Sequence, residues 1–138
     1  MRSKSKALVV MKPQEREHLE ECLANVKSFV KIWLDFYLTF RRSYLGEPVT
    51  PECEASFLRL KSEVAQRHQY LYDQLERHYI GGAVITDLLR AVVNLEKIAK
   101  TQSENYYKVE KNWHQFYLNL HDTVTSIQFR LEQEDQQT

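Results

Sequence analysis

Apolar side chains recur along most of this chain at alternating spacings of three and four residues, which is typical of amphipathic α-helices that pack lengthwise. The pattern divides into three stretches, and we expect one long helix in each: residues 13–44, 51–79 and 84–134. In the first stretch a second apolar column widens the stripe, so this helix should face more than one neighbour. The periodicity predicts an all-α fold built as an antiparallel bundle of three long helices.

Residues that begin and end helices stand at the boundaries between these stretches. Gly46 can end the first helix, and Thr50 followed by Pro51 suits an N-cap and a first helical position. The pair Gly81-Gly82 ends the second helix, because glycine readily adopts the positive φ of a chain reversal. Its surroundings lack the glycine and lysine spacing of a phosphate-binding loop. We interpret both breaks as turns between antiparallel helices.

The third stretch contains neither glycine nor proline, and its apolar positions keep their phase through the polar segment 100–105. This continuity favours one overlong helix of about 50 residues, although such lengths are rare. The alternative is a break near 101–105, where Thr101 and Glu104 have the spacing of a capping box and Gln102 places an amide among apolar positions. A break there would give a four-helix bundle.

The expected helix lengths point to self-association. At about 1.5 Å per residue, the three helices would span roughly 48, 42 and 75 Å. The first two would leave part of the third uncovered, although the third is apolar along its length and most aromatic in its distal half. An exposed aromatic stripe favours aggregation, so we expect a second copy to cover it in a homodimer. A four-helix bundle would close on itself and permit a monomer.

Large aromatic side chains are concentrated on the predicted packing faces. We call these positions, together with one leucine, the aromatic seam: Trp33, Tyr37, Phe40, Tyr106, Trp113, Phe116, Tyr117 and Leu120. Because they continue the helical spacing of their stretches, we interpret them as residues that pack the bundle or its interface. The aromatic density is therefore not taken as the lining of a pocket.

Composition restricts the class of protein further. The chain has 138 residues with 3 Gly and 3 Pro, which is low for a turn-rich all-β fold. We expect a single domain over residues 13–134, preceded by a basic, flexible segment 1–12 and followed by a disordered acidic tail 135–138. The apolar run 7–11 is too short for a signal peptide or a membrane helix. The predicted location is cytoplasmic, without a membrane partner.

The two cysteines do not have the spacing of a metal-binding or redox motif. In an antiparallel pair of helices, Cys22 and Cys53 would lie roughly 35 Å apart. This separation is far beyond the reach of a disulfide. We expect both to be reduced thiols that pack as small apolar groups.

A local grouping of basic residues raises an alternative function, that of a nucleic-acid-binding accessory protein. Overall, 19 basic and 19 acidic residues give a formal net charge of zero, so no global field attracts nucleic acid. Basic residues do gather near the first turn and along the second helix, where they could contact phosphates. These residues are Arg41, Arg42, Arg59, Lys61 and Arg67.

Histidines near carboxylates raise a second alternative, a metal-binding helical-bundle enzyme. Glu15 and His18 have the spacing found in di-iron bundles, but the chain holds no second copy of that motif. His114 and His121 share one face of the third helix near carboxylates. They lie beside the aromatic seam, so we interpret them as solvated or interface residues.

His68 falls on the packed face of the second helix, where we expect a hydrogen bond to a tyrosine such as Tyr72. No nucleophile with a nearby base is recognisable, so no catalytic residue, cofactor or metal is predicted. The sequence predicts a non-catalytic interaction or scaffolding module, not an enzyme, that self-associates through the aromatic seam.

Overall fold

The computed structural model describes residues 12–82 and 84–137, and within these ranges the regular elements are helices. They follow one another as α1 (Pro13–Tyr44), α2 (Pro51–Leu75), the 3₁₀ helix η2 (Glu76–His78), α3 (Val84–Ala91), α4 (Leu95–Ala99) and α5 (Ser103–Gln137). The predicted all-α fold is therefore confirmed. The predicted basic segment lies outside the described residues, apart from Lys12. α5 runs three residues past the predicted domain end at 134, where no glycine or proline interrupts the chain.

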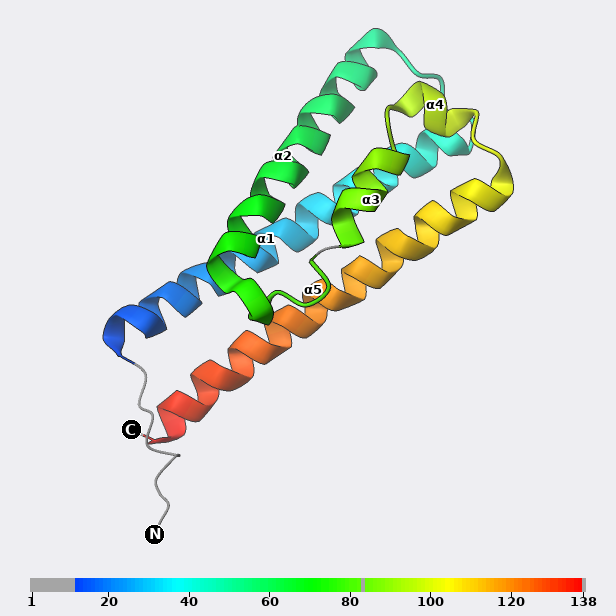
Figure 1. Cartoon of the computed structure of the whole chain (residues 1–138). Helices are drawn as coiled ribbons and strands as arrows, with labels where there is room; N and C mark the ends of the chain where they lie inside the picture. Colours follow the sequence, from blue (N-terminus) through cyan, green and yellow to red (C-terminus); the bar gives the residue numbers. More distant parts are fainter. Residues whose placement is uncertain (1–11, 83, 138) are drawn as a thin grey trace.

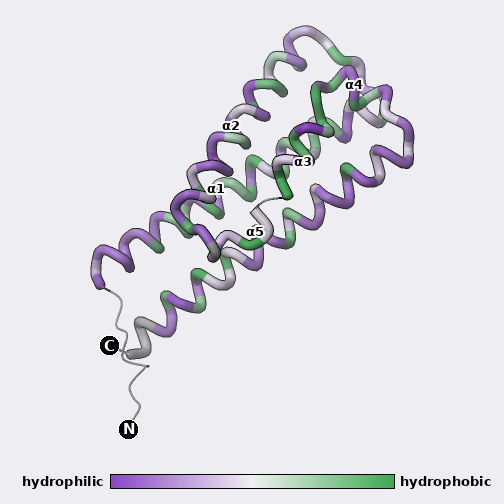
Figure 2. Tube along the Cα trace, viewed as in Figure 1, coloured by the Kyte–Doolittle hydropathy of each residue, from purple (hydrophilic) through white to green (hydrophobic). Residues whose placement is uncertain are grey.

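The long helices form an antiparallel bundle. Figure 1 shows α1 and α5 running side by side in opposite directions, while α2 returns along α1. α1 packs against α2, α4 and α5, and α3 packs against α5. α3 and α4 together take the place of one further helix between α2 and α5 (Figure 1). Figure 2 shows apolar positions alternating with hydrophilic ones along each long helix, as packing on one side and solvent on the other require.

The preference for one continuous third helix is wrong, because the chain leaves helical geometry twice between residues 91 and 103. At the first interruption Asn94 is the N-cap of α4, and its Oδ1 accepts a hydrogen bond from Lys97 N (2.8 Å). At the second, the Thr101 hydroxyl donates to Lys97 O (2.8 Å). The second interruption, residues 100–102, overlaps the alternative break predicted near 101–105, whereas the first belongs to neither prediction.

The turn between α1 and α2 has the predicted chemistry. Gly46 adopts a φ of 106°, and α2 begins at Pro51. The Thr50 hydroxyl accepts a hydrogen bond from Cys53 N (3.1 Å), and Thr50 N donates to Cys53 Sγ (3.0 Å). Cys53 and Cys22 are both free thiols, as predicted.

α2 ends at Leu75 instead of the predicted residue 79. Glu76 takes a positive φ of 49° there, and η2 redirects the chain so that Tyr79 becomes buried. Gly81 follows with a φ of 69°, and a Cβ at this position would collide with the Asn119 side chain of α5. The predicted glycine turn therefore serves a second purpose, because it lets the backbone approach α5 closely.

The centre of the bundle is a pair of tryptophans from α1 and α5. Trp33 Nε1 donates to Trp113 O (3.2 Å), Trp113 Nε1 donates to Trp33 O (3.0 Å), and their ring centroids are 5.9 Å apart. The exchange satisfies two buried N–H groups, each of which would cost about 1–3 kcal/mol if left without an acceptor. Phe116 meets the Trp33 ring edge-on, with centroids 5.1 Å apart. These contacts fix the register between α1 and α5.

The helix lengths in this fold do not require the homodimer that was expected from the sequence. α1 has 32 residues and α5 has 35, so both are roughly 50 Å long at about 1.5 Å per residue. Trp113 and Phe116 in the distal half of the third stretch are buried by α1 of the same chain. Among the described residues, α1 and α5 therefore have similar lengths, and neither has an overlong part that a second copy would need to cover.

Candidate functional site

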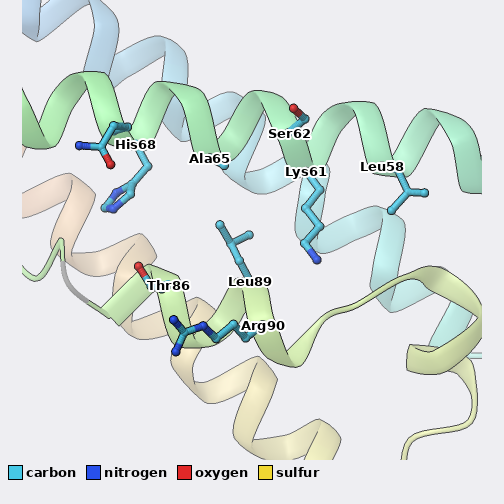
Figure 3. Close-up of a pocket in the computed structure, with 9 residues that line it drawn as sticks. Leu58, Lys61, Ser62, Ala65, His68, Thr86, Leu89 and Arg90 are labelled. Atoms are coloured by element: carbon cyan, nitrogen blue, oxygen red, sulfur yellow. The ribbon is translucent and has the colours of Figure 1, made fainter.

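An open groove separates α2 from α3. It has a volume of about 560 Å³, within the range of roughly 300–1,000 Å³ typical of ligand sites. Figure 3 shows side chains from both helices pointing into it. We call it the α2–α3 groove, and its lining residues are Leu58, Lys61, Ser62, Ala65, His68 and Gln69 of α2 with Thr86, Leu89 and Arg90 of α3.

The groove exists because α3 packs towards α5 and not towards α2. Ile85 and Leu88 of α3 are buried, and α3 contacts α5. Leu89 instead points towards α2 (Figure 3). The α2 residues on that side include Ser62 and Ala65, whose side chains are too small to reach across. The two helices therefore stay apart without a cavity being sealed between them.

Hydrogen bonds fix one end of the groove by holding the start of α4 against α2. The Glu54 carboxylate accepts hydrogen bonds from Leu95 N (2.7 Å) and Glu96 N (3.2 Å), the first backbone N–H groups of α4. Lys61 Nζ donates to Val93 O (3.3 Å) in the preceding connection. Burial lowers the pKa of Lys61 from its ordinary value. These contacts set the distance between α2 and the α3–α4 segment.

A buried histidine lies at the other end of the groove. His68 is 9% exposed, and its Nδ1 is 3.0 Å from the Tyr79 hydroxyl. The predicted tyrosine partner is thus present, but it is Tyr79 from beyond the end of α2, not Tyr72. Burial lowers the pKa of His68 and raises that of Tyr79, so both groups favour their neutral forms.

The charged groups that line the groove are cations. Among the described residues that line it, Lys61 and Arg90 contribute positive charge, and none is an aspartate or a glutamate. Within residues 12–82 and 84–137, Arg90 has no hydrogen bond or ion pair. Its side chain is exposed and extends along α3 towards Thr86 (Figure 3). The groove thus combines an apolar surface with a guanidinium that no described carboxylate neutralises.

The aromatic seam lies inside the bundle rather than around the groove. Six of its residues are buried: Trp33, Phe40, Tyr106, Trp113, Phe116 and Leu120. Tyr37 and Tyr117 are half-buried, and the Tyr37 hydroxyl donates to Glu110 Oε2 (2.8 Å). The Tyr106 hydroxyl is buried without a hydrogen bond of good geometry among the described residues, and burial, together with the nearby Glu110 carboxylate, raises the pKa of Tyr106.

Each of the predicted basic residues has a partner within the chain. Arg41 contacts Tyr37 and Glu110 at the contact between α1 and α5, whereas Arg42 pairs with Glu47 (3.4 Å) in the following turn. The three remaining residues lie on α2 and have different partners: Arg59 bonds to Ser56, Lys61 to Val93, and Arg67 to Ser28 and Glu63. The local acceptors reduce the charge that each could offer a phosphate backbone.

The candidate metal ligands remain apart as well. His114 and His121 are exposed on α5 and contact the Tyr117 ring from either side, with centroid distances of 6.3 and 4.6 Å. His18 Nε2 lies 3.6 Å from Cys22 Sγ. In the part of the chain that the structure describes, no three His, Cys, Asp or Glu side chains come together in a group that could hold a metal ion.

Sequence reasoning missed Leu89 and Arg90, because one continuous third helix would have placed them on an ordinary solvated face. It also missed Glu54, whose partners at the start of α4 lie more than forty positions away in sequence. The one local signal is Asn94, an N-cap residue type followed by apolar positions.

Comparisons with protein-family models, with curated proteins and with solved structures give no match for this chain. Among the helices described, none is both long enough and apolar enough to cross a membrane.

Proposed function

We propose that this protein is a non-catalytic interaction module that takes up a helical segment of a partner protein in the α2–α3 groove. The observation that carries this proposal is the separation of α2 from α3 by an open groove with apolar walls. Docking of an amphipathic helix into a groove between helices is a common mode of peptide recognition. The proposal keeps the interaction role expected from the sequence and moves it to a different surface.

The dimensions of the groove support a helical occupant. Leu58 and Gln69 mark its two ends on α2, and they are separated by roughly 16 Å at about 1.5 Å per residue. This length matches about three turns of a partner helix. Leu58 is 45% exposed and Leu89 is half-buried, so apolar surface is available to cover. Burial of such surface contributes about 25 cal/mol per Å².

Several features favour binding over catalysis. His68, the acid–base group of the groove, is engaged with Tyr79 and buried. Lys61 is engaged with the backbone of Val93. Both contacts hold the walls in place, which is a structural role. Self-association through the aromatic seam remains a separate prediction from the sequence, and the burial of Trp113 and Phe116 within one chain gives it no support.

Substitutions that place a larger side chain in the groove test the proposal, because they should weaken peptide binding. Helical peptides of about 14 residues, roughly four turns, would be displayed as a library with leucine or phenylalanine spaced to one face, and binders of the wild-type protein would be selected. Binding should weaken by about tenfold or more in Ala65→Leu, because the added side chain occupies the groove opposite Leu89. Ala24→Leu makes the same change on an exposed position of α1 and should leave binding unaltered.

Circular dichroism of both variants would establish that each is folded before binding is compared. Ser62→Leu, a second groove-filling variant, repeats the test from a neighbouring position of the same wall. Binders that retain wild-type affinity for both filled variants would place the interaction elsewhere and overturn the proposal.

A further inference from the structure

We infer that the α2–α3 groove selects an acidic partner, namely an amphipathic helix that presents a carboxylate to Arg90. This inference rests on the proposed function and adds the chemistry of the partner to it. Two observations support it: the charged side chains that line the groove are cationic, and the Arg90 guanidinium has no ion pair with any described residue.

The lining of the groove has a one-sided charge. Lys61 lies on the α2 wall and Arg90 on the α3 wall, and within the part of the chain that the structure describes no carboxylate lines the groove. The neighbouring Glu54 carboxylate accepts two backbone hydrogen bonds from α4, so it is committed to that helix start. A ligand that enters between Lys61 and Arg90 therefore has one cationic side chain on each wall, which complements negative charge.

Arg90 differs from Arg41 and Arg67, each of which forms an ion pair with a glutamate. Arg41 pairs with Glu110 (3.5 Å) and Arg67 pairs with Glu63 (3.3 Å). Arg90 has no such pair with any residue in the described ranges, and its side chain lies at the mouth of an apolar groove. A planar guanidinium in this position can accept a carboxylate in a bidentate arrangement.

The positions of the polar and apolar groups in the groove predict where the partner helix carries its apolar and acidic residues. Its apolar side chains would lie against Leu58, Ala65 and Leu89, which form the apolar part of the lining. Arg90 follows Leu89 directly and marks the solvent side of the same wall (Figure 3). An acidic residue at the edge of the apolar stripe, where a solvated flank begins, would therefore meet the guanidinium. A helix with basic flanks would meet two like charges instead.

The selected peptide library tests this chemistry when its flanking positions are randomised. Peptides that depend on the groove should be enriched in aspartate or glutamate at one register position. Replacement of that acid by its amide should weaken binding by about three- to fivefold at low salt, and less at high salt, as for an exposed ion pair. The variant Arg90→Gln should show the same loss for the acidic peptide and little change for the amide peptide.

A charge reversal and a matched control complete the experiment. Selection on Arg90→Glu should yield peptides with lysine or arginine at the same register position. Arg59→Gln removes one exposed arginine from α2 outside the groove and should leave the binding of every peptide unchanged. Far-UV circular dichroism of each variant would verify that it is folded.

The outcomes separate this inference from the proposed function. Peptides that lose affinity in Ala65→Leu but show no preference for acids, and no response to Arg90→Gln, would overturn the acidic partner while the groove remains a binding site. Peptides that bind both Ala65→Leu and Ser62→Leu as tightly as the wild type would overturn both. Acid enrichment that reverses on Arg90→Glu would support both.

Discussion

At the scale of single residues, His68 connects the groove to the stability of the fold. Its Nδ1 lies 3.0 Å from the Tyr79 hydroxyl, and its ring packs near Phe116 with centroids 6.4 Å apart. Burial lowers its pKa below the ordinary value of about 6.5. A proton on His68 is therefore less favourable in the folded chain than in the unfolded chain.

This difference predicts a dependence of stability on pH. Because the unfolded state takes up the proton first, the contribution of neutral His68 is complete above about pH 6.5 and is lost as the pH falls below that value. The free energy of unfolding, measured by urea titration, should therefore decrease between about pH 7 and pH 5. His68→Asn, which can keep a polar contact with Tyr79, should show a smaller decrease.

The exposed residue His114 provides the control for this experiment. His114→Asn should keep the pH dependence of the wild-type protein. If His68→Asn and the wild type lose the same free energy of unfolding over this pH interval, the account of His68 is wrong.

At the scale of elements, α4 depends on a partner from α2. The helix has only five residues, and short helices have little stability of their own. Glu54 of α2 accepts hydrogen bonds from two of its first N–H groups, and Asn94 accepts a third from Lys97 N. These acceptors stabilise a helix start that the local sequence alone supports only through Asn94.

Removal of the Glu54 carboxylate should therefore destabilise the protein. Glu54→Ala leaves two N–H groups of α4 without their acceptor, and we expect a loss of about 1–2 kcal/mol in the free energy of unfolding. Glu52→Ala removes an exposed carboxylate from the same first turn of α2 and should cost less than about 0.5 kcal/mol. Equal losses in the two variants, by urea titration, would show that the contact with α4 contributes nothing.

A side chain that fills the groove should make the folded protein more stable. Ala65→Leu adds apolar contact with Leu89 across the groove, and we expect the free energy of unfolding to rise by about 1 kcal/mol. Ala24→Leu on the outside of α1 should change it by less than about 0.5 kcal/mol. A marked loss of stability in Ala65→Leu would mean that this position is closely packed and that the groove is closed in solution.

The element scale also explains which parts of the fold could be predicted. The end of α1 and the start of α2 follow from Gly46, Thr50 and Pro51, whose effects are local. The third stretch was wrongly predicted as one helix because Val92, within the first interruption, and Leu95, at the start of α4, are both buried. The apolar spacing therefore persists without a continuous helix. The groove could not be predicted, because it depends on contacts between distant residues.

At the scale of the whole molecule, the fold closes within one chain. α5 and α1 have similar lengths, and the α3–α4 segment occupies the remaining side between α5 and α2. The tryptophan pair of Trp33 and Trp113 has both of its N–H groups satisfied within that bundle. The apolar surface that favoured a homodimer in the sequence is therefore covered without a second copy.

Light scattering tests this closure. We expect a mass of about 16.5 kDa, that of one chain, because the aromatic seam is already packed. A mass of twice that value would support the homodimer expected from the sequence and would require an interface other than the buried seam, or an exchange of helices between chains.

The most direct test of the central claim is to map where a selected helical peptide binds. Amide chemical shifts of the isotope-labelled protein would be recorded as the peptide is added. Binding in the α2–α3 groove predicts that the largest changes occur at Ser62, Ala65 and Leu89, with little change along the outer face of α1. Changes concentrated on α1 and α5, with Ala65 and Leu89 unaffected, would contradict the claim that the groove is the binding site.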